Sequence, residues 1–247
     1  MTDKQDTARP AQTVVISGAN RGLGLEFTRQ YAEDGWRVIA GCRQPERAGA
    51  LQALATDTQD RVRPHPVDVR DPAAVAALAE SCGNGAVDLL INCAGTMTRD
   101  TGPSGMLQGL DAVDYAHWTA EFETHVQGGF AMSAAFADSL ARAERPVIVN
   151  MSSGLGSIAN TDRGGIYYYR TAKAALNMLT RNLAADLRER GIIVISLDPG
   201  WVRTDMGGPK APLSPTESIA QLRRVIAGLT MADSGSFLTR GGDDRPW

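Results

Sequence analysis

The chain has 247 residues, 43% of them apolar and 21% charged, which is enough for one α/β domain with a sizeable core. The formal net charge of −3 gives no indication of nucleic acid or an anionic membrane as a partner. Residues 1–11 are polar, without a hydrophobic signal region, so we expect a flexible leader there and a single domain over residues 12–247.

The apolar runs and the cysteines are both typical of a cytoplasmic protein. No apolar run approaches the ~20 residues that would cross a bilayer. Cys42, Cys82 and Cys93 form no CxxC motif, so we expect free thiols in a reducing compartment, packed as small hydrophobic side chains, and no metal site.

Apolar, β-branched runs alternate with helical segments along the chain. We expect strands over 13–17, 37–42, 61–69, 87–95, 145–153 and 192–200. Helices are predicted over 23–35, 46–55, 71–83 and 174–191. The last of these carries an apolar stripe at helical spacing, formed by Leu176, Leu179, Leu183 and Leu187. This alternation predicts an α/β fold, a doubly wound Rossmann domain with a mainly parallel sheet of about seven strands.

The segment 203–220 contains three prolines and two glycines. We expect its first part to be a mobile substrate loop, with a helix that begins near Ser214 and Pro215.

A glycine-rich turn, "SGANRGLG" (residues 17–24), connects the first strand to the first helix. Gly18, Gly22 and Gly24 stand where the chain turns tightly, and a side chain there would keep a phosphate-bearing ligand from the backbone. The helix N-terminus would offer free N–H groups and a partial positive charge to a pyrophosphate. An ordinary turn also uses glycine, but the strand–turn–helix context favours dinucleotide binding.

The end of the second strand, "AGCRQ", favours NADP over NAD. An NAD site usually has an acid there to hold the ribose 2′-hydroxyl, and Cys42 occupies that position. Arg43 follows it and Arg21 lies in the glycine turn, so two guanidinium groups are available for a 2′-phosphate. The alternative for each arginine is a solvated surface charge.

Two further strand ends are candidates for cofactor contact. Asp68 could accept a hydrogen bond from the adenine amino group and Val69 could lie against the ring, although Asp68 could instead cap the helix before Pro72. Asn92, Ala94 and Gly95 let the backbone approach the cofactor ribose, but packing alone would also favour such small residues.

In the run "YYYRTAK" (residues 167–173), only Tyr169 has a lysine, Lys173, four residues ahead of it. On a helix the two share one face, and a nearby ammonium would lower the phenol pKa from its usual ~10. Ser152 or Ser153, at the end of "VIVNMSS", would face the same crevice and polarise a substrate carbonyl.

The segments "SGANRGLG", "NCAG", "NMSSGLGSIA", "YRTAK" and "DPGWVRTDMGG" together resemble a classical short-chain dehydrogenase/reductase, in particular the C-factor and sniffer-like carbonyl reductases, over residues 13–247. The resemblance implies that Tyr169 is the general acid/base, that Lys173 binds ribose and tunes Tyr169, and that Ser153, the second serine of its pair, polarises the carbonyl. The implied cofactor set is Gly18, Asn20, Arg21, Gly22, Leu23, Gly24, Arg43, Asp68, Val69, Asn92, Ala94, Gly95, Tyr169, Lys173, Pro199, Gly200, Val202 and Thr204.

One position departs from the family pattern. The family usually has an asparagine in the helix after the fourth strand, where it holds a water in a proton relay, and this chain reads "FETHVQGGF" with His125 there. Histidine titrates near neutral pH, so His125 either takes a relay role or is a packing residue.

These features predict an NADP(H)-dependent oxidoreductase that transfers a hydride between nicotinamide and a small carbonyl or alcohol substrate. The alternative is a dinucleotide-binding sensor or signalling protein without turnover. The expected substrate walls are residues 96–105 and 155–165, Trp201, and a 205–213 lid. The resemblance also implies a homodimer or homotetramer, formed through helices at about 112–142 and 166–190.

Overall fold

The computed structural model describes residues 11–98, 110 and 113–247 and contains one seven-stranded sheet. The strands are β1 (Thr13–Ser17), β2 (Arg37–Cys42), β3 (Val62–Pro66), β4 (Leu89–Asn92), β5 (Val147–Met151), β6 (Ile193–Asp198) and β7 (Phe237–Thr239). Their order is β3-β2-β1-β4-β5-β6-β7 and every pairing is parallel.

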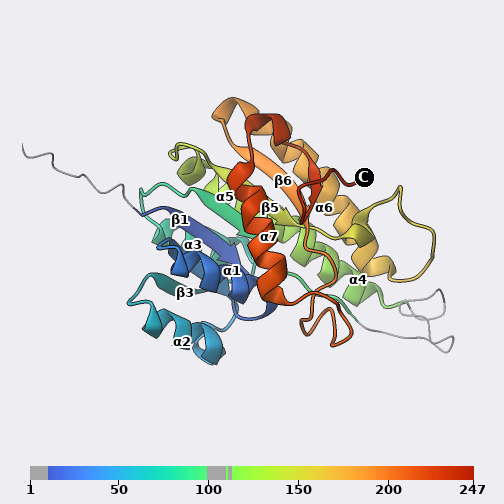
Figure 1. Ribbon diagram of the computed structural model, residues 1–247, viewed down its shortest axis with the longest axis horizontal. Helices are drawn as coiled ribbons and strands as arrows, with labels where there is room; N and C mark the ends of the chain where they lie inside the picture. Colours follow the sequence, from blue (N-terminus) through green and yellow to red (C-terminus); the bar gives the residue numbers. More distant parts are fainter. Residues whose placement is uncertain (1–10, 99–109, 111–112) are drawn as a thin grey trace, which may run out of the picture.

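Helices cover both faces of the sheet (Figure 1). They are α1 (Gly22–Glu33), α2 (Gly49–Asp57), α3 (Pro72–Ser81), α4 (Tyr115–Phe122), α5 (Gly128–Leu140), α6 (Tyr167–Asp186) and α7 (Pro215–Gly228). A π-helical turn, Glu123–Gln127, joins α4 to α5. Side chains of α1, α2 and α7 pack on one face, and those of α3, α5 and α6 on the other. The predicted doubly wound α/β fold is therefore confirmed.

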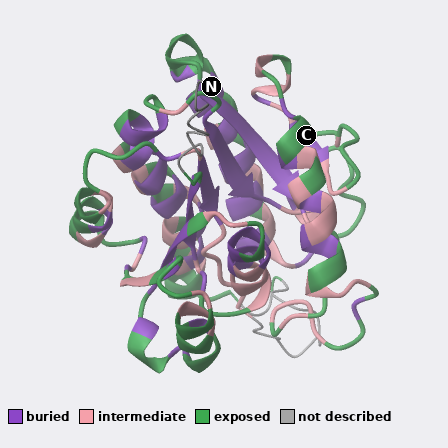
Figure 2. Ribbon diagram, turned by 60° about the vertical axis from the view of Figure 1, so that its left-hand side comes forward, coloured by how far each residue is buried: buried purple, intermediate pink, exposed green. Residues whose placement is uncertain are grey.

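The central strands are buried because each face of the sheet is covered (Figure 2). All residues of β1, β5 and β6 are buried, which explains why these strands read as continuous apolar runs rather than alternating ones. The expected leucine stripe packs on this core from α6, with Leu176, Leu183 and Leu187 buried.

Most predicted elements occur near their predicted bounds, with three informative differences. The third strand ends at Pro66 rather than at residue 69, and the fourth covers only residues 89–92. The helix predicted over 174–191 begins at Tyr167, after Ile166 in the left-handed region at φ 55°, so it carries Tyr169 and Lys173. Ser214 caps α7 in a capping box, as its Ser-Pro signal indicates.

The strand order reverses between β1 and β4, where a doubly wound sheet leaves a crevice at the carboxyl ends of its strands. The glycine turn follows β1, and the catalytic candidates follow β4 and β5 or lie on α6. Within the described residues, no helix is both long and apolar enough to cross a membrane.

Candidate active site

The glycine turn has the tight geometry that its sequence predicts. Gly18 (φ +72°) and Gly22 (φ +55°) adopt left-handed conformations. A Cβ on Gly18 would lie 2.7 Å from Ala94 Cα, and one on Gly24 would lie 2.2 Å from Gly18 O. Gly24 allows α1 to pack closely on the turn, and Gly18 allows the turn to meet the end of β4 through Ala94.

The N-terminus of α1 has no side-chain cap among the described residues, which leaves its first N–H groups available to an anion. Asn20 and Arg21 are exposed beside it, and Leu23 packs partly against the core. Arg21 Nη1 makes a 2.9 Å ion pair with Asp205, on the loop after β6. The turn therefore fits a pyrophosphate, while Arg21 is already in contact with the predicted substrate loop.

The remaining candidates near the adenosine end differ in their surroundings. Arg43 is exposed just after β2. Asp68 accepts from the Arg70 guanidinium at 2.7 and 3.1 Å, and this contact holds the pKa of Asp68 below its usual value. Asp68 does not cap the following helix, because Asp71 does so through Ala73 N. An adenine amino group that donates to the Asp68 carboxylate would have to share that carboxylate with the Arg70 guanidinium.

Val69 and Asn92 are enclosed by protein. Val69 packs against α5, where a Cβ on Gly128 would lie 2.6 Å from it. Asn92 Nδ2 donates to Asn150 Oδ1 (2.8 Å) and to Ser133 Oγ (3.2 Å), so this side chain links β4 to β5 and α5. These hydrogen bonds give Asn92 a structural role, and its contact with the cofactor ribose stays a prediction.

The segment after β6 lies against the glycine turn. A Cβ on Gly22 would lie 3.5 Å from Thr204 Cγ2. Gly200 has φ +76°, and Val202 is buried and pairs with Leu213. Pro199 O accepts from Ser218 Oγ of α7 at 2.8 Å. The fold thus brings two cofactor candidates from distant parts of the sequence, Gly22 and Thr204, to one place.

The two serines after β5 face different ways. Ser152 Oγ is buried and donates to Asn177 Oδ1 on α6 at 2.7 Å. Ser153 is partly exposed; its Oγ accepts from Leu155 N at 3.2 Å, and its side chain lowers the pKa of the Tyr169 phenol. The structure therefore pairs Ser153, and not Ser152, with the tyrosine. The neighbouring Tyr168 is fully buried and stacks on Trp118, as a packing residue does.

Lys173 and His125 are in direct contact inside the protein, with 4% and 3% of their surfaces exposed. Lys173 Nζ lies 2.9 Å from His125 Nδ1 and donates to Met151 O at 2.7 Å. His125 Nε2 lies 2.7 Å from Thr96 O. Since Nδ1 accepts from an ammonium, Nε2 carries the ring proton and donates to that carbonyl oxygen.

The His125 ring fits against a glycine and a tyrosine. A Cβ on Gly95 would lie 2.8 Å from His125 Cε1, so the ring occupies the space that glycine leaves. The ring meets Tyr169 edge to face at 5.5 Å. His125 lies in the π-helical turn, a feature that frequently marks functional sites in helices.

Burial controls the charge states in this cluster. Desolvation lowers the pKa of Lys173 to about 8, and nearby Cys93 and Glu121 oppose that shift. Desolvation, together with the Lys173 charge, holds the pKa of His125 well below 6.5. The imidazole is therefore neutral at physiological pH, and the pair carries at most the charge of the lysine.

The prediction that Lys173 lowers the Tyr169 pKa in the free protein is wrong. Tyr169 is 8% exposed, and its burial raises its pKa above 10 more than the Ser153 side chain lowers it. The carboxylates of Asp198 and Glu121 raise it further. Lys173 Nζ lies 5.4 Å from the centroid of the Tyr169 ring, beside its face.

Sequence reasoning missed three ionisable neighbours of this cluster. Glu121 is fully buried on α4, and Asp198 is buried at the end of β6. Cys93 follows β4, and burial raises its thiol pKa to about 12. Glu121 stands four residues before His125, and that helical spacing was the signal available for it.

The predicted substrate walls are only partly within the described residues, which exclude 99–105. Leu155 and the half-buried Thr96 follow β5 and β4 respectively. Trp201 is 57% exposed, and its Nε1 donates to Gly207 O at 2.8 Å in the expected loop. Closure of that loop as a lid stays a prediction.

The fold and this site together define a nucleotide-dependent oxidoreductase of the short-chain type. The short chain dehydrogenase family matches residues 12–212, and the chain belongs to it.

One protein sequence and two solved structures illustrate how similar this chain is to individual relatives. C-signal of Myxococcus xanthus is 39% identical over 171 residues, which cover 69% of this chain and 99% of that protein. The NADPH-bound carbonyl reductase from chicken fatty liver superposes with a TM-score of 0.87 at 34% identity, covering 96% and 99% of the two chains. Carbonyl reductase Sniffer of D. melanogaster gives 0.86 at 29% identity, covering 96% and 100%.

Proposed function

We propose that this chain is an NADP(H)-dependent carbonyl reductase that interconverts small aldehydes or ketones and their alcohols. The observation that carries the proposal is the joint position of Ser153, Tyr169 and Lys173. The Ser153 side chain lowers the pKa of the Tyr169 phenol, and Lys173 Nζ lies 5.4 Å from the centroid of the same ring. They meet at the carboxyl ends of the strands, where a doubly wound sheet binds its ligand.

The residues of the crevice suit a dinucleotide. The glycine turn and the uncapped N-terminus of α1 would hold the pyrophosphate. Gly200 and Thr204 would border the nicotinamide, and Lys173 would hold the ribose. Two N–H groups of the Lys173 ammonium bind His125 and Met151 O within the described structure, which leaves the third for a ligand hydroxyl. When bound, the cofactor supplies or accepts the hydride.

Each catalytic side chain has a separate task. Tyr169 gives its phenolic proton to the carbonyl oxygen during reduction and takes it back during oxidation. Its raised pKa in the free protein keeps it protonated and ready to donate. Ser153 donates a hydrogen bond to the same oxygen as negative charge develops there. His125 holds the Lys173 ammonium in place by a direct hydrogen bond.

NADP is the preferred dinucleotide in this proposal. β2 ends in Cys42 rather than in an acid. Arg43 and Arg21 are both exposed, so their guanidinium groups are available to a 2′-phosphate. The similar chicken carbonyl reductase was solved with NADPH bound.

A second function needs its own test because C-signal is among the relatives. A signalling protein could bind the dinucleotide without turning over a carbonyl compound. Such a protein has no need of a buried lysine, which costs solvation energy, beside a buried tyrosine.

The decisive experiment follows NADPH oxidation with a panel of aldehydes and ketones. We expect turnover by the wild type and a loss of ~10²- to 10⁴-fold in kcat/KM for Tyr169→Phe, with NADPH affinity retained. Tyr167→Phe is the matched control, because Tyr167 is only partly buried and outside the cluster, and it should retain activity. NADPH binding without turnover of any carbonyl would favour the signalling function instead.

A further inference from the structure

A partly buried ion pair adjoins Ser153, the proposed catalytic serine, from a part of the chain that sequence reasoning did not connect to the site. Arg245 Nη2 lies 2.6 Å from Asp198 Oδ2, with 27% and 6% of the two side chains exposed. A Cβ on Gly154, the residue after Ser153, would lie 3.1 Å from Arg245 Nη1 and 3.3 Å from Asp198 Oδ2. The pair therefore packs directly against the backbone that carries the serine.

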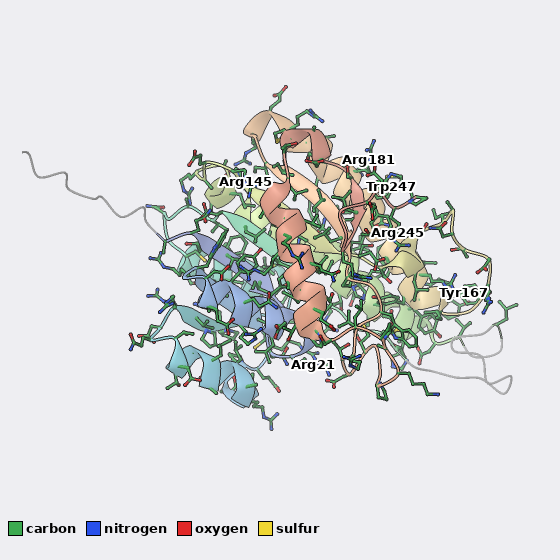
Figure 3. The ribbon with its side chains drawn as sticks, viewed as in Figure 1. Arg21, Arg145, Tyr167, Arg181, Arg245 and Trp247 are labelled. Atoms are coloured by element: carbon green, nitrogen blue, oxygen red, sulfur yellow. The ribbon has the colours of Figure 1, made fainter. Side chains whose placement is uncertain are left out.

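The segment around Arg245 is anchored on both sides of this contact. Arg245 N donates to Phe237 O of β7 at 2.7 Å. The Trp247 ring stacks on Phe237 at 5.5 Å, and the Arg181 guanidinium lies 5.9 Å from its centre. Figure 3 shows Arg245, Trp247 and Arg181 on one side of the molecule, remote from Arg21. These contacts hold the backbone of residues 245–247 in place, and the Asp198 carboxylate pairs with the guanidinium.

The same segment also holds the loop after the serine. Ser157 Oγ donates to Pro246 O at 2.6 Å, and Ala159 N donates to Trp247 O at 2.8 Å. Residues 245–247 thus bind the 153–159 segment at two points and pack against it at Gly154. This segment includes part of the predicted substrate wall.

Asp198 connects two parts of the site through its two oxygens. Oδ1 accepts from Gly200 N at 3.0 Å, in the turn predicted to border nicotinamide. Oδ2 takes the Arg245 ion pair. The Asp198 charge also acts on Tyr169 and disfavours its phenolate. Arg245 opposes that effect, since an opposite charge at 2.6 Å cancels much of the field of the carboxylate.

Other groups face Tyr169 from each element packed around it. Lys173 lies on its own helix, His125 comes from the π-helical turn, and Glu121 from α4. Cys93 lies on the segment after β4. Asp198 is the member of this set that has an arginine as its ion-pair partner, so its charge can be switched without touching the tyrosine, the lysine or the serine.

We propose that Arg245 is a positioning residue of the active site, which neutralises Asp198 at the end of β6 and holds the Ser153–Gly154 backbone against that strand end. The inference rests on the proposed oxidoreductase function, because it assigns Arg245 an effect on the protonation of Tyr169 during turnover. Asp198 and Arg245 act through their neighbours and make no contact with the reacting atoms.

The test is the pH profile of alcohol oxidation, in which Tyr169 must be deprotonated. Arg245→Met leaves the Asp198 charge uncompensated, so the pH of half-maximal kcat/KM should rise by about half a unit to one unit. Asp198→Asn leaves the arginine charge, and the same pH should fall by a similar amount. The double variant Asp198→Asn/Arg245→Met should return close to the wild-type value.

These opposite shifts distinguish the proposal from a purely structural role, which would lower activity without moving the profile in two directions. Arg245→Lys keeps the charge and should keep the wild-type profile, even where lost packing lowers kcat/KM. Arg188→Met, at an exposed arginine after α6, is the matched control and should change nothing. Shifts of the same sign in both single variants, or none in either, overturn the proposal.

A readout without turnover separates this inference from the proposed function. The ionisation of Tyr169 in the NADP⁺ complex is followed by tyrosinate absorbance, with each protein compared with its own Tyr169→Phe version. The same opposite shifts should appear there.

If the wild type turns over no carbonyl compound but these shifts occur, the proposed function fails and the Arg245 assignment holds. If the wild type turns over carbonyl compounds but the tyrosinate titration does not shift, the proposed function holds and the Arg245 assignment fails. If Arg245→Met does not fold, the fall expected for Asp198→Asn still tests the assignment, and its absence overturns it.

Discussion

Two charged contacts border the crevice, and they differ in how firmly the fold holds them. Lys173 and His125 are buried, at 4% and 3% exposure, and touch at 2.9 Å. Arg21 and Asp205 also touch, at 2.9 Å, but 65% and 76% of their side chains are exposed. The contact distances are alike, yet water screens the second pair and not the first. We therefore expect the buried contact to matter more for activity and stability than the exposed one.

The largest expected effect comes from removing the buried cation. Lys173→Met has a similar length but no donor for ribose, for Met151 O or for His125. We expect kcat/KM for carbonyl reduction to fall ~10²- to 10³-fold, with KM for NADPH raised. Arg188→Met, at an exposed arginine after α6 and outside the site, is the control. Unchanged kinetics in Lys173→Met would falsify the catalytic assignment of this cluster.

The fit of the His125 ring against Gly95 gives the next prediction. In Gly95→Ala the new Cβ would lie 2.8 Å from His125 Cε1, so we expect a loss of about 1–3 kcal/mol in the free energy of unfolding. The same substitution in a His125→Ala background should cost much less, because the ring is absent. Urea denaturation of the four proteins measures this coupling. Equal costs in both backgrounds contradict the contact.

The sequence identified Lys173, Gly95 and His125 as candidates, but it did not predict that they contact one another. Glycine spacing and strand–helix alternation were enough to predict the parallel sheet and the turn at Gly18, because both follow from local backbone rules. Tyr169 and Lys173 could be paired because four residues on a helix share one face. The third strand was predicted too long, since Val67 and Val69 are buried yet lie beyond the last sheet pairing at Pro66.

Partners that lie far apart in the sequence could not be found by such rules. The contact between His125 and Lys173 spans 48 positions, and the contact between Arg21 and Asp205 spans 184. The direction of the Tyr169 pKa shift was also missed, because burial depends on the whole fold and outweighs one nearby ammonium. Residue type and helical spacing identify candidates, whereas packing sets their charge states.

The buried Lys173–His125 contact also predicts how the free energy of unfolding depends on pH. The folded protein keeps His125 neutral, with its pKa well below 6.5, whereas the unfolded chain binds a proton there below about pH 6.5. The contribution of His125 to the free energy of unfolding is therefore fully present above about pH 6.5. It is lost as the pH falls below that value, by up to about 1.4 kcal/mol per pH unit. His125→Asn should lose stability less steeply between about pH 7 and pH 5 in urea denaturation. Parallel curves would show that His125 takes up its proton in the folded state as readily as in the unfolded one.

On the exposed side, Arg21 should affect cofactor choice more than stability. If it contacts a 2′-phosphate, Arg21→Ala should raise KM for NADPH by about 3- to 10-fold and leave KM for NADH almost unchanged. Arg43→Ala should act in the same direction. An equal rise for both dinucleotides would instead place Arg21 at the pyrophosphate.

The smallest effect is expected at Asp205, and it completes the contrast with His125. Asp205→Asn removes the charge that competes with a ligand phosphate for Arg21, so KM for NADPH should stay the same or fall slightly. Because the Arg21–Asp205 pair is largely exposed, the free energy of unfolding should change by less than about 0.5 kcal/mol. Added salt should remove any difference in KM, since the screening length is about 10 Å at 0.1 M. A large loss of stability in Asp205→Asn would mean that this loop contact, like the buried lysine and histidine, is part of the folded framework rather than a screened surface pair.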